Sequence, residues 1–130
     1  MPEKGVIPKN PDEILSFEEI KNIVQIIVPL GIIRVKITGG EPLARKGVVH
    51  LIEMLAGVEG ISDISMTTNG ISLAKFAKDL NGAGLNRINI SLDSLNEAKF
   101  ASITRGGDIK NVWQGIEEAL EAGLNPVKIN

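Results

Sequence analysis

Four short segments of this chain share one pattern, in which polar and apolar residues alternate. Successive side chains of a strand point to opposite faces, so each segment predicts a strand with one apolar and one polar face. A helical pattern separates each segment from the next, and helical crossovers join parallel strands. The sequence therefore predicts a parallel α/β sheet whose polar rows are Arg34/Lys36/Thr38, Ser65/Thr67/Asn69, Asn89/Ser91/Asp93 and Lys128/Asn130.

The polar rows limit how helices can cover this sheet. A parallel sheet with helices on both faces usually has strands that are apolar throughout. Alternating strands instead indicate helices on one face and solvent or a ligand on the other. This arrangement is typical of part of a (β/α) barrel, whose site lies at the carboxyl ends of the strands. Ser65 and Asn89 could alternatively be ordinary polar residues of a sheet edge, but four matching strands favour a partial barrel.

Capping and turn residues set the expected boundaries. Ser16-Phe17-Glu18-Glu19 has the form of a capping box, which predicts a helix from Phe17 that Pro29 and Gly31 end. Residues 1–15 are expected to form an extended lead-in to a single domain, 1–130. The remaining elements are predicted as strands at 32–37, 61–66, from 87 and from 126, and as helices through 48–55, 73–80, 96–103 and 112–120.

Length and charge exclude several classes of protein. With 130 residues, 43% of them hydrophobic, the chain is long enough for one domain with a core. Its net charge is −2 without a basic run, so we expect no nucleic-acid partner and no anionic membrane surface. No apolar stretch has membrane-spanning length and no signal peptide opens the sequence, which predicts a cytoplasmic protein. Open strands at both sides of the sheet predict a homo-oligomer.

The sequence contains no cysteine and one histidine, His50. Disulfides, thiolate catalysis and metal clusters held by the chain's own thiolates are therefore excluded. A zinc site is not expected either, because such sites recruit several His or Cys ligands.

The first strand ends in Thr38-Gly39-Gly40-Glu41-Pro42. Glycine lacks a Cβ atom, so Gly39 and Gly40 can adopt positive φ and bring backbone groups close to a ligand. Glu41 is placed to accept a hydrogen bond from an ammonium or hydroxyl group. The plainer interpretation is a tight strand-to-helix turn with a solvated glutamate.

The order of TGGEP, TTNG, SLDS, ITRGG and PVKIN along the chain resembles the MoaA family. These radical S-adenosylmethionine enzymes are lyases that convert GTP to its 3',8-cyclised product in molybdenum cofactor biosynthesis. The resemblance covers the whole chain, which looks like a family member that starts just past its last cluster cysteine. It implies an incomplete (β/α) barrel of the radical S-adenosylmethionine type.

The resemblance also implies ligand contacts. Gly39, Gly40 and Glu41 would cradle the amino end of S-adenosylmethionine, and Ser91 would contact the same cofactor. Acceptors for an ammonium and a hydroxyl for a ribose or carboxylate fit that chemistry.

For the substrate GTP, the resemblance implies contacts from Lys36, Thr67 and Lys128. Lys128 would place a cation against phosphate. Lys36 stands where the family commonly has arginine. Lysine keeps the positive charge but lacks the two-pronged guanidinium that binds a phosphate through two hydrogen bonds. Four other motif residues, Asn69, Asp93, Arg45 and Arg105, are explained equally well by turns, caps and solvation, and we interpret His50, Trp113 and Met66 as structural or surface residues.

In the family, three cysteines hold a [4Fe-4S] cluster that cleaves S-adenosylmethionine to a 5'-deoxyadenosyl radical. The present chain has no ligand for that cluster, so we predict that it is inactive alone and assign it no catalytic residue and no metal ligand. Two alternatives stay open: a cysteine-free module that binds S-adenosylmethionine or a nucleotide, and a barrel enzyme that uses Glu41, Asp93 and Lys128 for acid-base chemistry. A fragment of another radical S-adenosylmethionine enzyme is a third possibility.

Overall fold

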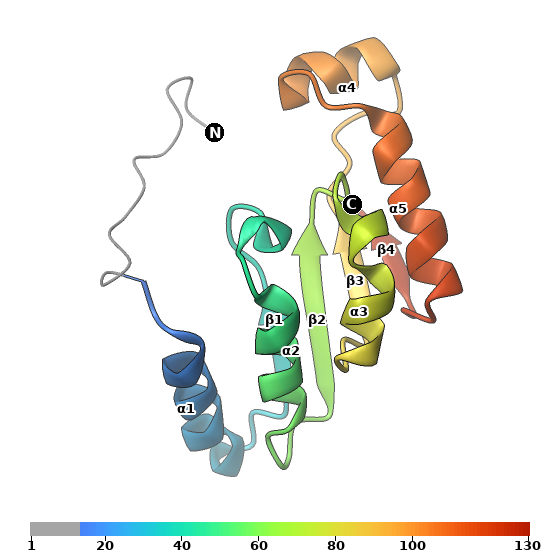
Figure 1. Cartoon of the computed structure of the whole chain (residues 1–130). Coiled ribbons are helices and arrows are strands. Elements are labelled where there is room, and N and C mark those ends of the chain that lie inside the picture. Colours follow the sequence, from blue (N-terminus) through green and yellow to red (C-terminus); the bar gives the residue numbers. More distant parts are fainter. Residues whose placement is uncertain (1–13) are drawn as a thin grey trace.

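The computed structural model describes residues 14–130, so most of the predicted lead-in, 1–13, lies outside the described residues. Its centre is a sheet of four parallel strands in the order β1-β2-β3-β4, as Figure 1 shows. The parallel sheet predicted from the sequence is confirmed. Its strands are β1 (Arg34–Ile37), β2 (Asp63–Thr68), β3 (Arg87–Ile90) and β4 (Val127–Ile129).

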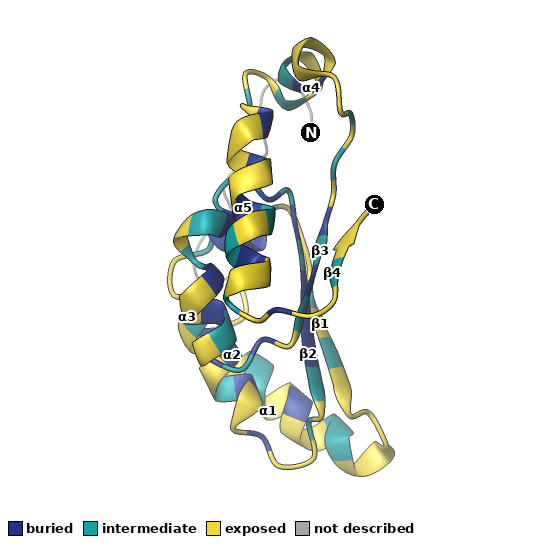
Figure 2. Ribbon diagram, turned by 90° about the vertical axis from the view of Figure 1, so that its right-hand side faces the viewer, coloured by how far each residue is buried: buried dark blue, intermediate teal, exposed yellow. Residues whose placement is uncertain are grey.

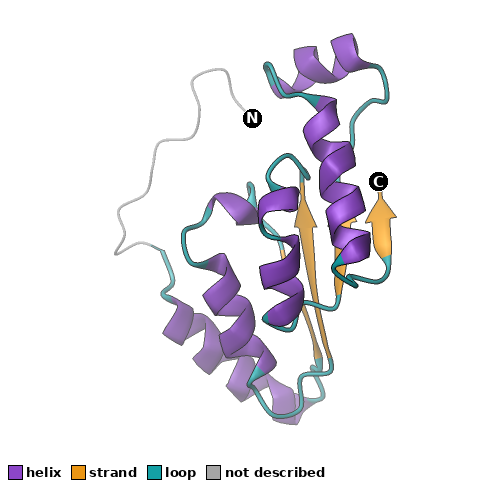
Figure 3. Cartoon of the chain, turned by 45° about the vertical axis from the view of Figure 1, so that its right-hand side comes forward, coloured by secondary structure: helices purple, strands orange, loops and turns teal. Residues whose placement is uncertain are grey.

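Helices cover one face of this sheet and leave the other open (Figure 2). Three short 3-10 helices punctuate the connections, and α4 lies beyond the carboxyl ends of the strands (Figure 3). Helices on one face only are the arrangement of a partial (β/α) barrel, as the alternating strands predicted. The elements are α1 (Phe17–Ile27), η2 (Val28–Leu30), η3 (Pro42–Ala44), α2 (Val48–Ala56), η4 (Leu73–Lys75), α3 (Ala77–Gly82), α4 (Glu97–Thr104) and α5 (Ile109–Glu121).

Strand register places all four polar rows on the face without helices, which we call the open face. Lys36 is the register partner of Ser65, and Ser65 of Arg87. One row further along the strands, Thr67 pairs with Asn89, and Asn89 with Lys128. On the opposite face Ile64, Met66, Ile88 and Ile90 are buried in one core with side chains of α2, α3 and α5.

The predicted start of the chain's first helix is confirmed. Ser16 accepts a hydrogen bond from the Glu19 amide at 3.1 Å, and Glu19 accepts one from the Ser16 amide at 2.7 Å, which completes the capping box. On this helix Val24 is buried but Ile23 is 47% exposed. The apolar residues of the helix are therefore divided between the core and the surface of the described residues.

Several predicted boundaries were wrong by one or two residues. β1 begins at Arg34, and Ile32 and Ile33 are exposed, because the chain pairs with β2 only from Arg34 onward. β2 runs from Asp63 to Thr68, two residues later than predicted. The helix predicted through 73–80 is divided at Phe76 into η4 and α3.

Helix α5 packs closely on the turn after β2. A Cβ atom on Gly115 would lie 2.8 Å from the carbonyl oxygen of Gly70 and 3.0 Å from Cβ of Leu73. Only glycine allows such a backbone approach, since a methyl group would force the two elements apart. The turn that follows β2 is therefore seated directly on the helix layer.

Candidate functional site

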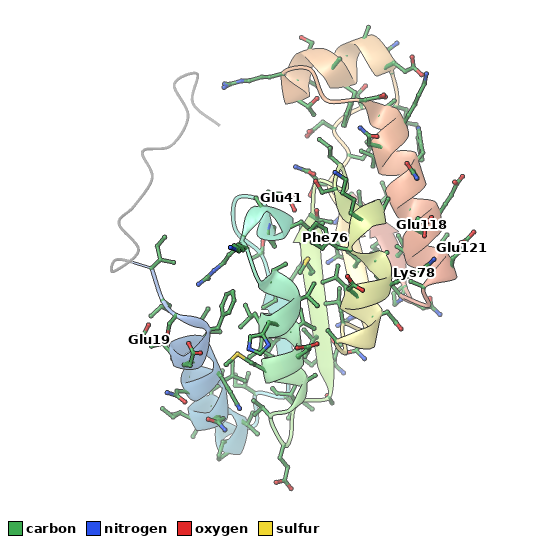
Figure 4. All side chains as sticks on the ribbon, viewed as in Figure 1. Glu19, Glu41, Phe76, Lys78, Glu118 and Glu121 are labelled. Carbon is green, nitrogen blue, oxygen red and sulfur yellow. The ribbon has the colours of Figure 1, made fainter. Side chains whose placement is uncertain are left out.

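The turns after β1, β2 and β3 gather at the carboxyl edge of the sheet, where Figure 4 places Glu41. In the first turn, Gly39 has φ 146° and Gly40 follows it, both exposed. Within residues 14–130, and apart from the chain neighbours, no atom lies within 4 Å of a Cβ built on either glycine. The described part of the chain therefore leaves the backbone of this turn accessible.

Glu41 accepts three hydrogen bonds from the protein. Its Oε1 accepts from the Leu43 amide at 3.0 Å and from the hydroxyl of Thr68 at 2.7 Å. Its Oε2 accepts from the Asn69 amide at 2.8 Å. The carboxylate therefore joins the turn after β1 to the end of β2, and a wholly solvated glutamate is ruled out.

Thr67 and Lys128, two of the three predicted GTP residues, lie in one register row with Asn89 between them. Neighbouring strands are about 4.8 Å apart, so the row spans about 10 Å of the open face. The hydroxyl oxygen of Thr67 is buried and has no hydrogen-bond partner within residues 14–130. Because buried hydroxyls are normally paired, this oxygen is an exception among the described residues.

Lys36, the third predicted GTP residue, is exposed on β1 and lies one row nearer the amino ends than Thr67. The strands contribute Arg34, Lys36, Arg87 and Lys128 to the open face, against one carboxylate, Asp63. This excess of three positive charges contrasts with the net charge of −2 of the whole chain. The open face therefore favours an anionic ligand.

Ser91, the residue predicted to contact S-adenosylmethionine from the third strand, follows β3 directly. Its amide donates to the Thr68 carbonyl oxygen at 2.9 Å, which holds it at the carboxyl edge, and its side chain is exposed. The structure thus brings Gly39, Gly40 and Ser91 to the same edge of the sheet, on either side of the end of β2.

The four motif residues without an assigned ligand have distinct surroundings. Arg45 donates to the Leu15 carbonyl oxygen at 2.5 Å and lies 4.5 Å from the ring centre of Phe17, so it fastens α1 to the η3 turn. The other three, Asn69, Asp93 and Arg105, line a cavity of about 400 Å³ together with Ile71, Ile103 and Thr104. Asn69 also forms the predicted turn, since its Oδ1 accepts from the Ile71 amide at 2.9 Å.

The three residues that we interpreted as structural or surface residues lie in the core or on the surface, away from the open face. Met66 is fully buried, Trp113 is 40% exposed on α5, and His50 lies beside Glu53 on the surface of α2. Within residues 14–130, no three His, Asp or Glu side chains converge to hold a metal ion. The described helices are also too short or too polar to span a bilayer.

The structure adds two residues that the sequence interpretation did not place at the site. Asn89 lies between Thr67 and Lys128, and its position in a polar row was the available signal. Thr68 is 2% exposed and binds Glu41, a contact between residues 27 positions apart that no local pattern indicates.

Comparisons with known proteins show what the chain is similar to. The family model of the Radical SAM superfamily matches residues 3–130. Over its full length the chain is 62% identical to the GTP 3',8-cyclase of Thermodesulfovibrio yellowstonii and 52% identical to that of Alkaliphilus oremlandii. It spans about 41% of the length of these two relatives.

Proposed function

Because this chain belongs to the Radical SAM superfamily, we propose that it is the part of a cytoplasmic GTP 3',8-cyclase that positions S-adenosylmethionine and GTP. Its relatives at 52–62% identity carry that name, and the reaction belongs to molybdenum cofactor biosynthesis. S-adenosylmethionine is the source of the radical chemistry in this superfamily. The chain's own task in this proposal is to bind and orient the two ligands.

The observation that carries the proposal is the buried, unpaired hydroxyl of Thr67 in one row with Asn89 and Lys128. A nucleotide bound on the open face supplies the missing partner for that hydroxyl. Its phosphates would meet Lys128 and Lys36, the lysines on the two outer strands. Positive charge and an unsatisfied polar atom together favour a nucleotide over an apolar ligand.

S-adenosylmethionine fits at the edge of the same face. The exposed backbone at Gly39 and Gly40, followed by Glu41, would receive the amino end, and Ser91 would meet the ribose or carboxylate. The two ligands would then lie side by side, since the end of β2 is shared by both groups of residues.

The [4Fe-4S] cluster of the superfamily does not fit the residues present. Iron–sulfur clusters are held by cysteine thiolates, and this sequence has none. Any cluster ligands must come from outside the sequence, so we assign no reaction step to this chain alone. Reconstituted and reduced protein is expected to form no 5'-deoxyadenosine above a cluster-free control. Formation above that control would contradict this assignment.

Calorimetric titration of the chain with GTP and with S-adenosylmethionine tests the proposal. We expect weak, saturable binding of each ligand and no comparable binding of guanosine, which lacks phosphates. Replacing Thr67 by valine should weaken GTP binding about three- to tenfold, the effect of one net hydrogen bond. S-adenosylmethionine binding is the internal control and should not change. Equal binding of guanosine and GTP, or unchanged GTP binding by Thr67→Val, would overturn the GTP assignment.

A second candidate is a binding module that holds one of these ligands without chemistry. The absence of cysteine favours it. Such a module requires tight binding by the chain itself, whereas part of a larger enzyme should bind weakly. The same titration therefore separates the two functions.

A further inference from the structure

We propose that Glu41 is a positioning residue, which locks the Gly39-Gly40 turn against the end of β2 in the shape that receives S-adenosylmethionine. This inference rests on the proposed function, because it assumes that the turn binds that cofactor. It differs from a direct contact, in which the carboxylate itself would be the main acceptor for the cofactor's ammonium.

The acceptor capacity of the carboxylate supports this role. An ionised carboxylate offers about four lone-pair positions. Three protein donors already use Glu41, namely the Leu43 amide, the Thr68 hydroxyl and the Asn69 amide, at 2.7–3.0 Å. Hydrogen bonds to an ionised group are the stronger kind. Most of the carboxylate's capacity is therefore used within the protein.

The donors come from two separate parts of the fold. Leu43 belongs to η3, immediately after the glycine turn, and is buried. Thr68 is the last residue of β2 and Asn69 follows it. Thr68 is anchored further because its hydroxyl accepts from the Gly70 amide at 3.1 Å. Glu41 is thus a clamp between the cofactor turn and a buried strand end.

The glycine turn needs such a clamp because no described residue packs where a side chain of its glycines would lie. Within residues 14–130, and apart from the chain neighbours, no atom lies within 4 Å of a Cβ built on Gly39 or Gly40, and both residues are exposed. Glycine also loses more conformational freedom on ordering than any other residue. Among the described residues, the turn is therefore held at its two ends, by β1 on one side and by Glu41 on the other.

Thr68 separates the two roles experimentally. It is 2% exposed, so it lies beneath the turn and not on the ligand side. Thr68→Val removes the hydroxyl that Glu41 accepts and leaves the carboxylate in place. A positioning role predicts that this buried change disturbs the turn, whereas a direct ammonium contact predicts that it does not.

We would measure nuclear magnetic resonance relaxation of the Gly39 and Gly40 amides in the ligand-free chain. Thr68→Val and Glu41→Gln should both lower the backbone order parameters of these glycines, while Gly31, which lies at the far end of β1, keeps its value. Thr68→Ser retains the hydroxyl and should restore the order. Unchanged order parameters in folded Thr68→Val and Glu41→Gln would overturn the proposal without any use of ligand.

The second measurement is a titration with S-adenosylmethionine, in which the resonances of the Gly39 and Gly40 amides report the binding affinity. We expect Thr68→Val to weaken binding at least threefold and Glu41→Gln at least fivefold. In the double variant the fold-loss of affinity should be smaller than the product of the two single fold-losses, because both changes disturb the same contact between Thr68 and Glu41. Wild-type affinity of Thr68→Val beside a large loss in Glu41→Gln would establish the direct contact and overturn positioning.

A matched control guards against general loss of stability. Ser62→Ala removes a hydroxyl that donates to the Ile33 carbonyl oxygen at 3.2 Å, near the amino ends of the strands. It should leave the glycine order parameters and the cofactor affinity unchanged. Failure of the wild-type chain to bind S-adenosylmethionine would refute the proposed function, and the relaxation measurement would still decide the role of Glu41.

Discussion

Arg87 donates two hydrogen bonds to one carboxylate oxygen of Asp63, from Nε at 3.1 Å and from Nη2 at 2.5 Å. The pair joins the first residues of β3 and β2 on the open face, and the two side chains are 41% and 20% exposed. It therefore joins the amino ends of the two central strands, at the edge opposite to the turns that follow β1, β2 and β3.

Asp63→Asn should lower the free energy of unfolding by about 0.5–1 kcal/mol, since the pair is only partly shielded from solvent. Urea denaturation followed by circular dichroism measures this loss. Glu118→Gln is the control, because Glu118 and Lys78 lie 3.9 Å apart with Lys78 77% exposed, and it should have no measurable effect. Equal losses for the two variants would show that the Asp63–Arg87 pair contributes no more to the free energy of unfolding than the exposed Lys78–Glu118 pair.

Lys36→Arg should tighten GTP binding about two- to fivefold, because a guanidinium grips phosphate with two parallel hydrogen bonds while an ammonium acts as a point charge. Calorimetry at one fixed salt concentration measures the change. Lys46→Arg is the control, since Lys46 is an exposed residue between η3 and α2. If Lys36→Arg weakens GTP binding, Lys36 does not face the phosphates.

Gly115→Ala should destabilise the protein by about 1–3 kcal/mol, because its methyl group would meet the Gly70 carbonyl and the Leu73 side chain. Gly82→Ala is matched to it: Gly82 ends a helix, and within the described part of the chain no atom lies within 4 Å of a Cβ built on it. That variant should be as stable as the wild type or up to about 1 kcal/mol more stable. Thermal unfolding of both compares them, and equal stability would contradict the close contact.

Ile129→Lys should reduce self-association. Ile129 is 49% exposed on β4, an outer strand of the described sheet, and charged residues on outer strands oppose pairing between chains. Light scattering over a wide concentration range measures the oligomer. Leu120→Lys, at a 57% exposed position of α5, should leave the association as it is. A wild-type chain that stays monomeric throughout would remove the basis of this prediction.

Patterns repeated along the chain predicted most of the fold. Alternation in each strand and helical spacing between strands are local properties, and they indicated a parallel sheet with helices on one face. The limits of a strand depend instead on where the neighbouring strand pairs with it. The prediction therefore wrongly included Ile32 and Ile33 in a strand that begins at Arg34. The break at Phe76 between η4 and α3 likewise depends on how α5 packs on η4.

The candidate site was only partly predictable. Gly39, Gly40, Ser91, Thr67 and Lys128 stand at strand ends or in polar rows, which a period of two makes visible. The contact between Glu41 and Thr68 joins two turns through space, and neither residue carries a local signature of it. Sequence therefore indicated which residues lie on the open face and at its carboxyl edge, but not what holds them in place.

The three hydrogen bonds of Glu41 also have an energetic consequence for the proposed binding of two ligands. One carboxylate connects the glycine turn to Asn69, which directly follows β2 and lies two residues beyond Thr67. A ligand that orders either side through this link reduces the entropy that the second must still lose. The cofactor and the nucleotide should accordingly bind with positive cooperativity, each raising the affinity of the other by the same factor.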